Sequence, residues 1–155
     1  MKLKQFFKTT DPGQTFALGF RLGQILKGGE VICLFGELGA GKTVLAKGLG
    51  KGLGVQDEIT SPTFTLIQEY LVEEKGLTFV HMDLYRLRHW EEAEVIGVSD
   101  FFREDTVCLL EWPEIITELL PADRLEIIIE GSGDLERAIT FIPKGRGKKW
   151  FFEEL

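Results

Sequence analysis

The sequence has few cysteines, no long apolar run and fewer basic than acidic residues, and each of these features argues against a class of protein. Its two cysteines, Cys33 and Cys108, each lie alone within an apolar run. We therefore expect two small buried thiols in a reducing, cytoplasmic protein, rather than a disulfide scaffold or a metal pair. No apolar run approaches the ~18 residues that a membrane span requires. The N-terminus also lacks the apolar stretch and cleavage site of a secretory signal.

The charge balance argues against a broad nucleic-acid-binding face. The net charge is −7 and the isoelectric point is near 4.9, whereas such faces are strongly basic. One basic cluster, Lys144, Arg146, Lys148 and Lys149, lies near the end of the chain. We interpret it as a solvated turn, with docking to RNA or a nucleotide as the alternative. The length and composition predict a single domain over residues 1–155.

One segment carries a complete phosphate-binding motif, the P-loop. Residues 36–43, Gly-Glu-Leu-Gly-Ala-Gly-Lys-Thr, match G-x-x-x-x-G-K-[ST]. The glycines allow a tight path with inward-pointing N–H groups, and a following helix adds the positive end of its dipole. Lys42 would place a charge on the β and γ phosphates, and the Thr43 hydroxyl is a hard oxygen ligand for Mg²⁺. The expected nucleotide contacts here are Gly36, Glu37, Leu38, Gly39, Ala40, Gly41, Lys42, Thr43 and Val44.

Strand and helix patterns alternate along the chain. Thr9 to Asp11 followed by Pro12 predict the start of a helix that Gly28 and Gly29 end. Further helices are expected after the P-loop and at 91–102 and 114–120. Strands are expected at 31–35, 63–72, 77–83, 106–112, 125–129 and 137–142. This order predicts an α/β fold of the P-loop NTPase type, with a mostly parallel sheet flanked by helices and antiparallel additions at two hairpin-like pairs.

The helix after the P-loop is intrinsically weak. It contains Gly48, Gly50 and Gly52, and each glycine costs about 1 kcal/mol relative to alanine. We expect that this helix either packs closely on a neighbour or ends early.

Two acidic residues end predicted strands and are candidates for the metal site. Asp83 ends the strand Phe-Val-His-Met-Asp, and Glu111 ends Val-Cys-Leu-Leu-Glu. A P-loop site needs such a carboxylate to hold Mg²⁺ or its waters. Many P-loop proteins use aspartate, so Glu111 departs from the commonest form. The sequence does not decide which of the two touches the metal directly.

Four blocks now occur in order: Gly36–Thr43, Ser-Pro-Thr-Phe-Thr-Leu-Ile-Gln-Glu-Tyr at 61–70, His-Met-Asp-Leu-Tyr-Arg-Leu at 81–87, and Leu-Glu-Trp-Pro-Glu at 110–114. Together they closely resemble the bacterial TsaE family, also called the YjeE family. The resemblance covers nearly the whole chain, and it is specific in the blocks rather than between them.

The resemblance implies a Mg²⁺-dependent ATPase in the threonylcarbamoyladenosine modification of tRNA. Family members work with the TsaB and TsaD proteins and meet tRNA only through that complex. Carried onto this chain, Lys42 and Thr43 bind phosphate and metal, and Glu111 completes the metal site. Asp83 takes part in hydrolysis or metal positioning. Thr63 resembles a switch residue that approaches the γ-phosphate.

Several other residues have two interpretations at this stage. Trp112 packs beside the site or is a core aromatic, and Arg137 contacts the nucleotide or is a strand-edge charge. Thr10 lies near the adenine or, together with Asp11, caps the first helix, which is better supported. We interpret His81 as a satisfied polar residue rather than a catalyst.

Three alternative functions remain open. A small-molecule kinase normally needs an arginine-bearing lid, but only Arg86 and Arg88 of the seven arginines lie close together. A GTPase normally has an Asn-Lys-x-Asp segment, which is absent. A nucleotide-gated adaptor with little turnover overlaps with the family role. Because the sequence offers no obvious arginine finger, we expect weak ATPase activity in the isolated chain.

Overall fold

A computed structural model describes residues 4–62, 65–131 and 133–145. Thr63 and the basic residues Arg146, Lys148 and Lys149 therefore lie outside the described residues. Within them, seven strands form one sheet in the order β1-β7-β6-β2-β5-β4-β3. Their bounds are β1 Gln5–Thr9, β2 Val31–Phe35, β3 Ile67–Val72, β4 Leu77–Asp83, β5 Thr106–Glu111, β6 Arg124–Glu130 and β7 Arg137–Lys144.

The sheet is parallel in its centre and antiparallel at both edges. Strands β6, β2, β5 and β4 run parallel to one another. The β3–β4 and β6–β7 pairs are antiparallel, as the hairpin-like sequence predicts. Strand β1, which the sequence patterns do not predict, adds a third antiparallel pairing, to β7. The fold is therefore a mixed α/β fold, in which the predicted parallel sheet is confined to the central strands.

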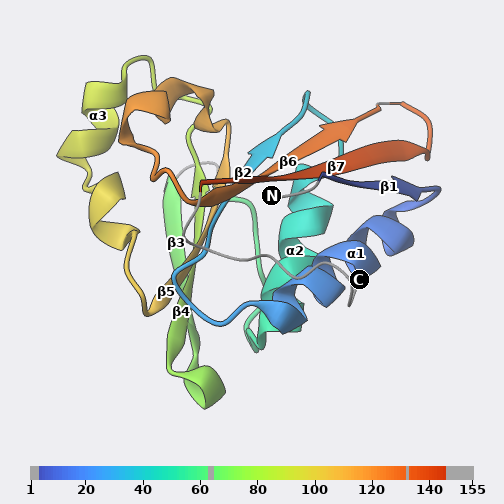
Figure 1. Ribbon diagram of the computed structural model, residues 1–155, viewed down its shortest axis with the longest axis horizontal. Coiled ribbons are helices and arrows are strands. Elements are labelled where there is room, and N and C mark those ends of the chain that lie inside the picture. Colours follow the sequence, from blue (N-terminus) through green and yellow to red (C-terminus); the bar gives the residue numbers. More distant parts are fainter. Residues whose placement is uncertain (1–3, 63–64, 132, 146–155) are drawn as a thin grey trace.

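Helices cover both faces of this sheet (Figure 1). Helices α1, Pro12–Ile25, and α2, Lys42–Leu53, pack together on one face, and α3, Trp90–Val95, lies on the other. Short 3-10 segments complete the chain: η1 Glu73–Lys75, η2 Val98–Phe101 and η3 Pro113–Leu119. The two faces have separate apolar cores, as expected for strands that are buried on both sides. In the described part of the chain, no helix is long and apolar enough to cross a membrane.

Glycines bring α1 and α2 into close backbone contact. A Cβ added at Gly48 would lie 2.2 Å from the Phe16 carbonyl oxygen, and one at Gly52 would lie 2.0 Å from that of Phe20. Gly19 and Gly23 of α1 face α2 backbone in the same way. The glycines that weaken α2 in isolation are thus the residues that let it pack, and this packing fixes the helix that follows the P-loop.

Several predicted elements have different bounds in the structure, and three of these changes have a clear cause in the backbone. Strand β3 begins at Ile67, because Leu66 has a φ of +64° and its N–H donates to Pro62 in a turn. The helix predicted over 91–102 is broken at Gly97, whose φ of +80° separates α3 from η2. Strand β5 ends at Glu111, since Trp112 has a φ of +57°.

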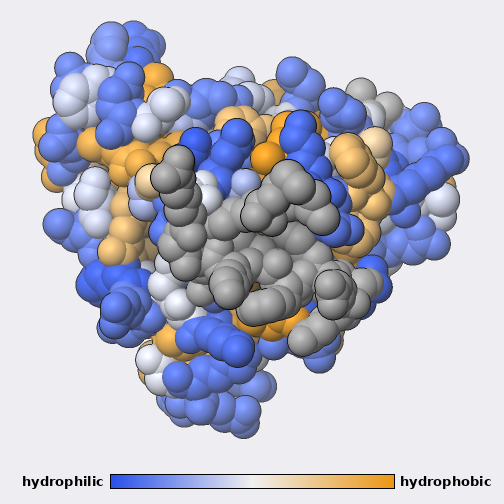
Figure 2. Space-filling model, viewed as in Figure 1, coloured by the Kyte–Doolittle hydropathy of each residue, from blue (hydrophilic) through white to orange (hydrophobic). Residues whose placement is uncertain are grey.

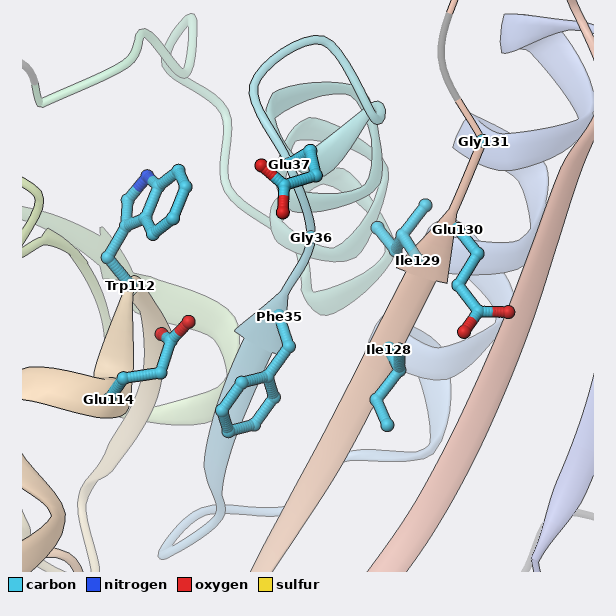
Figure 3. A pocket seen from close by; sticks show the side chains of 9 residues that line it. All are labelled: Phe35, Gly36, Glu37, Trp112, Glu114, Ile128, Ile129, Glu130 and Gly131. Atoms are coloured by element: carbon cyan, nitrogen blue, oxygen red, sulfur yellow. The ribbon is translucent and has the colours of Figure 1, made fainter.

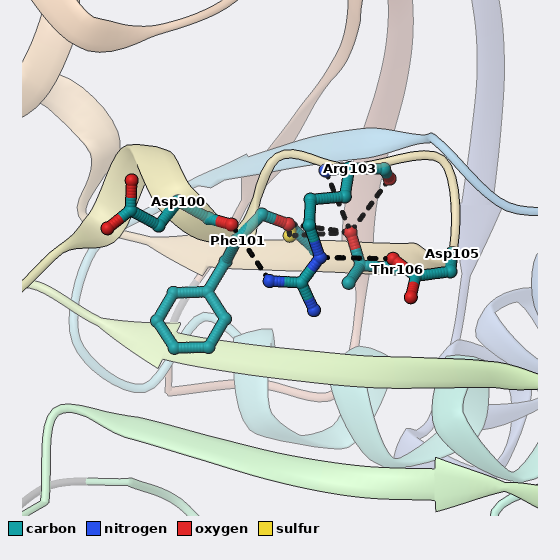
Figure 4. A network of polar contacts seen from close by, with 6 residues as sticks. Asp100, Phe101, Arg103, Asp105 and Thr106 are labelled. Carbon is teal, nitrogen blue, oxygen red and sulfur yellow. Dashed lines mark hydrogen bonds and ion pairs between the residues drawn. The ribbon is translucent and has the colours of Figure 1, made fainter.

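Polar contacts join the first residue of β5 to the loop that precedes the strand (Figure 4). The Thr106 hydroxyl lies 2.6 Å from the Phe101 carbonyl oxygen and 3.2 Å from the Arg103 backbone nitrogen. The Arg103 guanidinium donates to Asp105 and to the Asp100 carbonyl oxygen. This network anchors the loop between η2 and β5, and the other end of β5 carries Glu111.

Both cysteines are free and buried, as expected. Burial raises the pKa of the Cys33 thiol, and likewise that of Cys108, to about 12. Both thiols are therefore neutral at physiological pH.

The face shown in Figure 2 is mostly hydrophilic, with separate apolar patches.

Candidate functional site

The P-loop segment connects the end of β2 to the start of α2. Its backbone turns at Gly39 and at Gly41, which have φ values of +83° and +106°. Non-glycine residues rarely adopt such values, so the motif glycines are required by the backbone path. Lys42 is the first residue of α2. The positive end of the helix dipole is consequently directed at the loop.

A cavity of about 490 Å³ lies against the P-loop segment. We call it the P-loop cavity. It receives residues from the loop, from the ends of β4 and β5, and from the segment before β3. Its lining residues are Leu38, Gly39, Gly41, Lys42, Thr43, Val44, Ser61, Asp83, Tyr85, Arg86, Glu111 and Trp112.

Asp83 and Glu111 come together because β4 and β5 are adjacent parallel strands. The two residues are direct partners in the strand register, so their side chains leave the same edge of the sheet. Burial raises the pKa of Asp83 above its ordinary value. The Tyr85 backbone N–H, which donates to Asp83 at 3.1 Å, partly offsets this, while nearby Glu111 adds to it.

Lys42 is 5% exposed and its ammonium group already has two partners. Its Nζ donates to the Gly36 carbonyl oxygen at 2.7 Å. The same atom lies 3.5 Å from the centroid of the Trp112 ring, a cation–π contact. Burial lowers the pKa of Lys42, and nearby acids, Glu111 first, partly oppose this.

Trp112 follows β5 directly and has a left-handed backbone conformation, with φ +57° and ψ +52°. This conformation is strained for a bulky residue and is found mainly where surrounding structure enforces it. The ring packs on Tyr85 at a centroid distance of 5.0 Å. Trp112 therefore borders the P-loop cavity rather than the core, which favours the first of its two interpretations.

The carboxylate of Glu111 is in contact with the imidazole ring of His81. The Nε2 of His81 lies 2.6 Å from Oε2 of Glu111, and both side chains are buried. The other ring nitrogen, Nδ1, is buried without a hydrogen-bond partner among the described residues. The expectation that His81 is a fully satisfied polar residue is therefore wrong in part.

A second cavity, of about 390 Å³, is lined by Gly36 and shares Trp112 with the P-loop cavity (Figure 3). Phe35, Ile128 and Ile129 give it apolar walls at the ends of β2 and β6, and Trp112 and Glu114 approach from the end of β5. Glu37 and Gly36 line this cavity. In Figure 3, Glu130 points toward β7 and away from Trp112.

Two residues that the sequence predicts as nucleotide contacts, Arg137 and Thr10, do not line the P-loop cavity. Arg137 braces the P-loop: its Nε donates to the Ala40 carbonyl oxygen at 2.9 Å and its Nη2 to that of Gly39 at 3.2 Å. Thr10 donates to the Gln14 side chain, and Asp11 caps α1 as expected. Contacts of Arg137 and Thr10 with a nucleotide stay predictions. Thr63 lies outside the described residues.

Sequence patterns alone miss some residues that line or support the P-loop cavity. Ser61 and Tyr85 belong to the recognisable blocks, but their residue types do not indicate a role there. His81 lies two residues before Asp83 in β4, and this spacing places both side chains on one face of the sheet. That spacing is the signal in the sequence that points to His81.

The oxygen atoms in the P-loop cavity fit Mg²⁺. The Thr43 hydroxyl and the carboxylates of Asp83 and Glu111 are hard ligands that line the same cavity. Among the described residues, no group of three or more His, Cys, Asp or Glu side chains is arranged to hold a metal by itself. Two carboxylates can be enough, because Mg²⁺ sites commonly use one or two and complete their shell with substrate phosphates and water.

Known proteins resemble this chain in sequence and in fold. The model of the family described as "Threonylcarbamoyl adenosine biosynthesis protein TsaE" matches residues 9–139. A Bacillus subtilis protein named tRNA threonylcarbamoyladenosine biosynthesis protein TsaE is 42% identical over 149 residues, which are 96% of this chain and 92% of that one. A Treponema pallidum protein of the same name is 43% identical over 122 residues, or 79% and 88% of the two chains. The crystal structure of Bacillus subtilis YdiB matches with a TM-score of 0.75 and 39% identity, over 94% of this chain and 88% of that one.

Proposed function

Because the chain belongs to the TsaE family, we propose that it is a Mg²⁺-dependent ATPase that supports the TsaB–TsaD complex. The family name assigns it to the biosynthesis of threonylcarbamoyladenosine in tRNA. One observation carries the ATPase proposal: Lys42, Thr43, Asp83 and Glu111 come from three separate segments and line one cavity. That arrangement combines a phosphate-binding loop with carboxylates that suit a metal.

Each residue then has a defined role. On nucleotide binding, Lys42 exchanges the Gly36 carbonyl oxygen and the Trp112 ring for the β and γ phosphates. Thr43 and Glu111 would hold Mg²⁺, and Asp83 would hold a metal-bound or attacking water. When bound, Mg²⁺ would supply positive charge beside the phosphates.

The brace formed by Arg137 supports this role indirectly. Its guanidinium holds two P-loop carbonyl groups, and this leaves the loop's N–H groups to be directed at an anion. We propose that Arg137 maintains the shape of the loop rather than neutralising charge in the transition state.

Turnover by the chain alone is proposed to be weak. Among the described residues, Arg86 is the one arginine that lines the P-loop cavity. Two large side chains at the rim, Leu38 and Tyr85, are 66% and 55% exposed. An apolar rim of this kind suits a protein partner that covers the nucleotide and completes the site. The same rim favours the adaptor alternative, in which the bound state matters more than turnover.

Calorimetric titration with Mg²⁺–ATP and Mg²⁺–GTP tests the nucleotide assignment. We expect tighter binding of ATP and loss of that binding in Lys42→Ala. Lys47→Ala serves as the matched control, because Lys47 lies in the same helix but does not line the P-loop cavity. Preferential binding of GTP would contradict the proposal.

A further inference from the structure

His81 and Glu111 form a buried contact between neighbouring strands β4 and β5. The atoms Nε2 and Oε2 are 2.6 Å apart, and the two side chains are 0% and 5% exposed. His81 lies on β4, which pairs with β5 on one side and β3 on the other, and its ring stacks on Phe79 with centroids 6.2 Å apart. The imidazole is thus fixed by its strand and by a neighbouring ring, whereas glutamate has a flexible side chain.

The proposed role of Glu111 assigns the proton in this contact. A carboxylate that holds a metal ion accepts hydrogen bonds and donates none, so in that role Nε2 of His81 carries the proton between the two groups. Nδ1 then faces the interior with no partner among the described residues. An apolar side chain would fill this position without leaving a buried polar atom unpartnered, so packing alone does not account for a histidine here.

We propose that His81 is a positioning residue for Glu111. Its Nε2–H holds Oε2 of the carboxylate against the sheet, and this turns Oε1 toward the P-loop cavity that Glu111 also lines. The inference rests on the proposed role of Glu111 in holding Mg²⁺. Side chains that orient a metal ligand in this way typically change metal affinity by about 10–100-fold when they are replaced.

Two substitutions separate positioning from packing. His81→Phe keeps an aromatic ring of similar size against Phe79 and removes the N–H donor. His81→Gln returns an N–H donor at about the reach of Nε2. His89→Gln is the matched control, because His89, the other histidine of the chain, is exposed and does not line the P-loop cavity.

The first measurement is Mn²⁺ affinity, by electron paramagnetic resonance, with a non-hydrolysable ATP analogue bound. We expect His81→Phe to weaken Mn²⁺ binding by about 10–100-fold. Binding of the analogue without metal should be unchanged. His81→Gln should recover most of the lost affinity, and His89→Gln should match the native chain. Equal Mn²⁺ affinity in native and His81→Phe chains would overturn the positioning role and leave the proposed function intact. Failure of the native chain to bind Mn²⁺ would instead contradict the proposed function.

The second measurement needs neither metal nor nucleotide. Long-range ¹H–¹⁵N spectra of the His89→Gln chain contain the signals of His81 alone. We expect a proton on Nε2. An imidazole that is protonated on Nδ1 only would overturn the inference, whatever the metal affinities are, and this test stands even if His81→Phe does not fold.

Discussion

The ammonium group of Lys42 lies over the face of Trp112, 3.5 Å from the ring centroid, while it donates a hydrogen bond to Gly36. The lysine of the phosphate-binding motif is therefore engaged with the protein itself. In the proposed function, phosphate oxygens would replace both contacts. The residue that bears the ring, Trp112, has the left-handed backbone conformation described above.

Trp112 should report nucleotide binding through its fluorescence. When phosphates draw Lys42 away from the ring, the cation leaves the indole face, and the emission should change on addition of ATP. The change should be absent in Trp112→Phe, although Trp90 and Trp150 still emit. A response of the same size in that variant would show that the signal comes from Trp90 or Trp150, and it would contradict this prediction.

Replacing Gly52 by alanine should destabilise the protein even though alanine is the better helix former. The gain in helix propensity is about 1 kcal/mol, but the new Cβ would lie 2.0 Å from the Phe20 carbonyl oxygen. Backbone atoms cannot move aside cheaply, and overpacking of this kind costs about 1–3 kcal/mol or more. Because the contact is with backbone, we take the upper end of that range, and chemical denaturation should show a net loss of about 2 kcal/mol or more.

Gly13→Ala is the control for that substitution. It is the same chemical change in a helix, but its Cβ would meet only the tip of the Asp11 side chain, at 3.1 Å. We expect little loss of stability there. If Gly52→Ala is as stable as Gly13→Ala, the close contact between α1 and α2 is not required.

Stability without ligands should depend on pH through Asp83. Burial raises the pKa of Asp83, so its contribution to stability is complete below the unfolded-state pKa and is lost as the pH rises through the folded-state pKa. In the Asp83→Asn variant the amide side chain stays neutral at every pH and can accept the same backbone hydrogen bond. The melting temperature of this variant should therefore exceed that of the native chain by a margin that grows with pH and then levels off.

Thermal unfolding between about pH 4, near the ordinary pKa of aspartate, and about pH 8 measures this margin. Glu74→Gln, on the exposed η1 turn, controls for the general effect of removing one negative charge. An Asp83→Asn chain that is less stable than the native chain at the upper end of this range would contradict the assigned environment of Asp83.

Several residues that line the P-loop cavity can be found in the sequence for physical reasons. The glycines and Lys42 of the P-loop are recognisable because the backbone path and the phosphate charge each require a particular residue. Asp83 and Glu111 follow from the rule that parallel strands end at one edge. In contrast, β1 is short and lies at an edge, so its pattern is weak. Its Phe7 packs on Phe141, while the neighbouring Phe6 is 74% exposed.

Other features depend on tertiary contacts that no local pattern contains. The brace from Arg137 to the P-loop joins residues 97 positions apart. The His81–Glu111 pair joins two strands at a separation of 30. The break at Gly97 replaces a predicted helix by two short segments, because the left-handed conformation of this residue ends the helical hydrogen bonds.

The most direct test of the central proposal is ATP hydrolysis with and without the TsaB–TsaD pair. The native and Lys47→Ala chains should hydrolyse ATP slowly alone and faster with the pair. Lys42→Ala should lose that stimulation, with a fall of about 100-fold or more, because no charge then meets the transferred phosphoryl group. Stimulation of Lys42→Ala to the native rate would contradict the proposal, and so would rapid hydrolysis by the native chain alone.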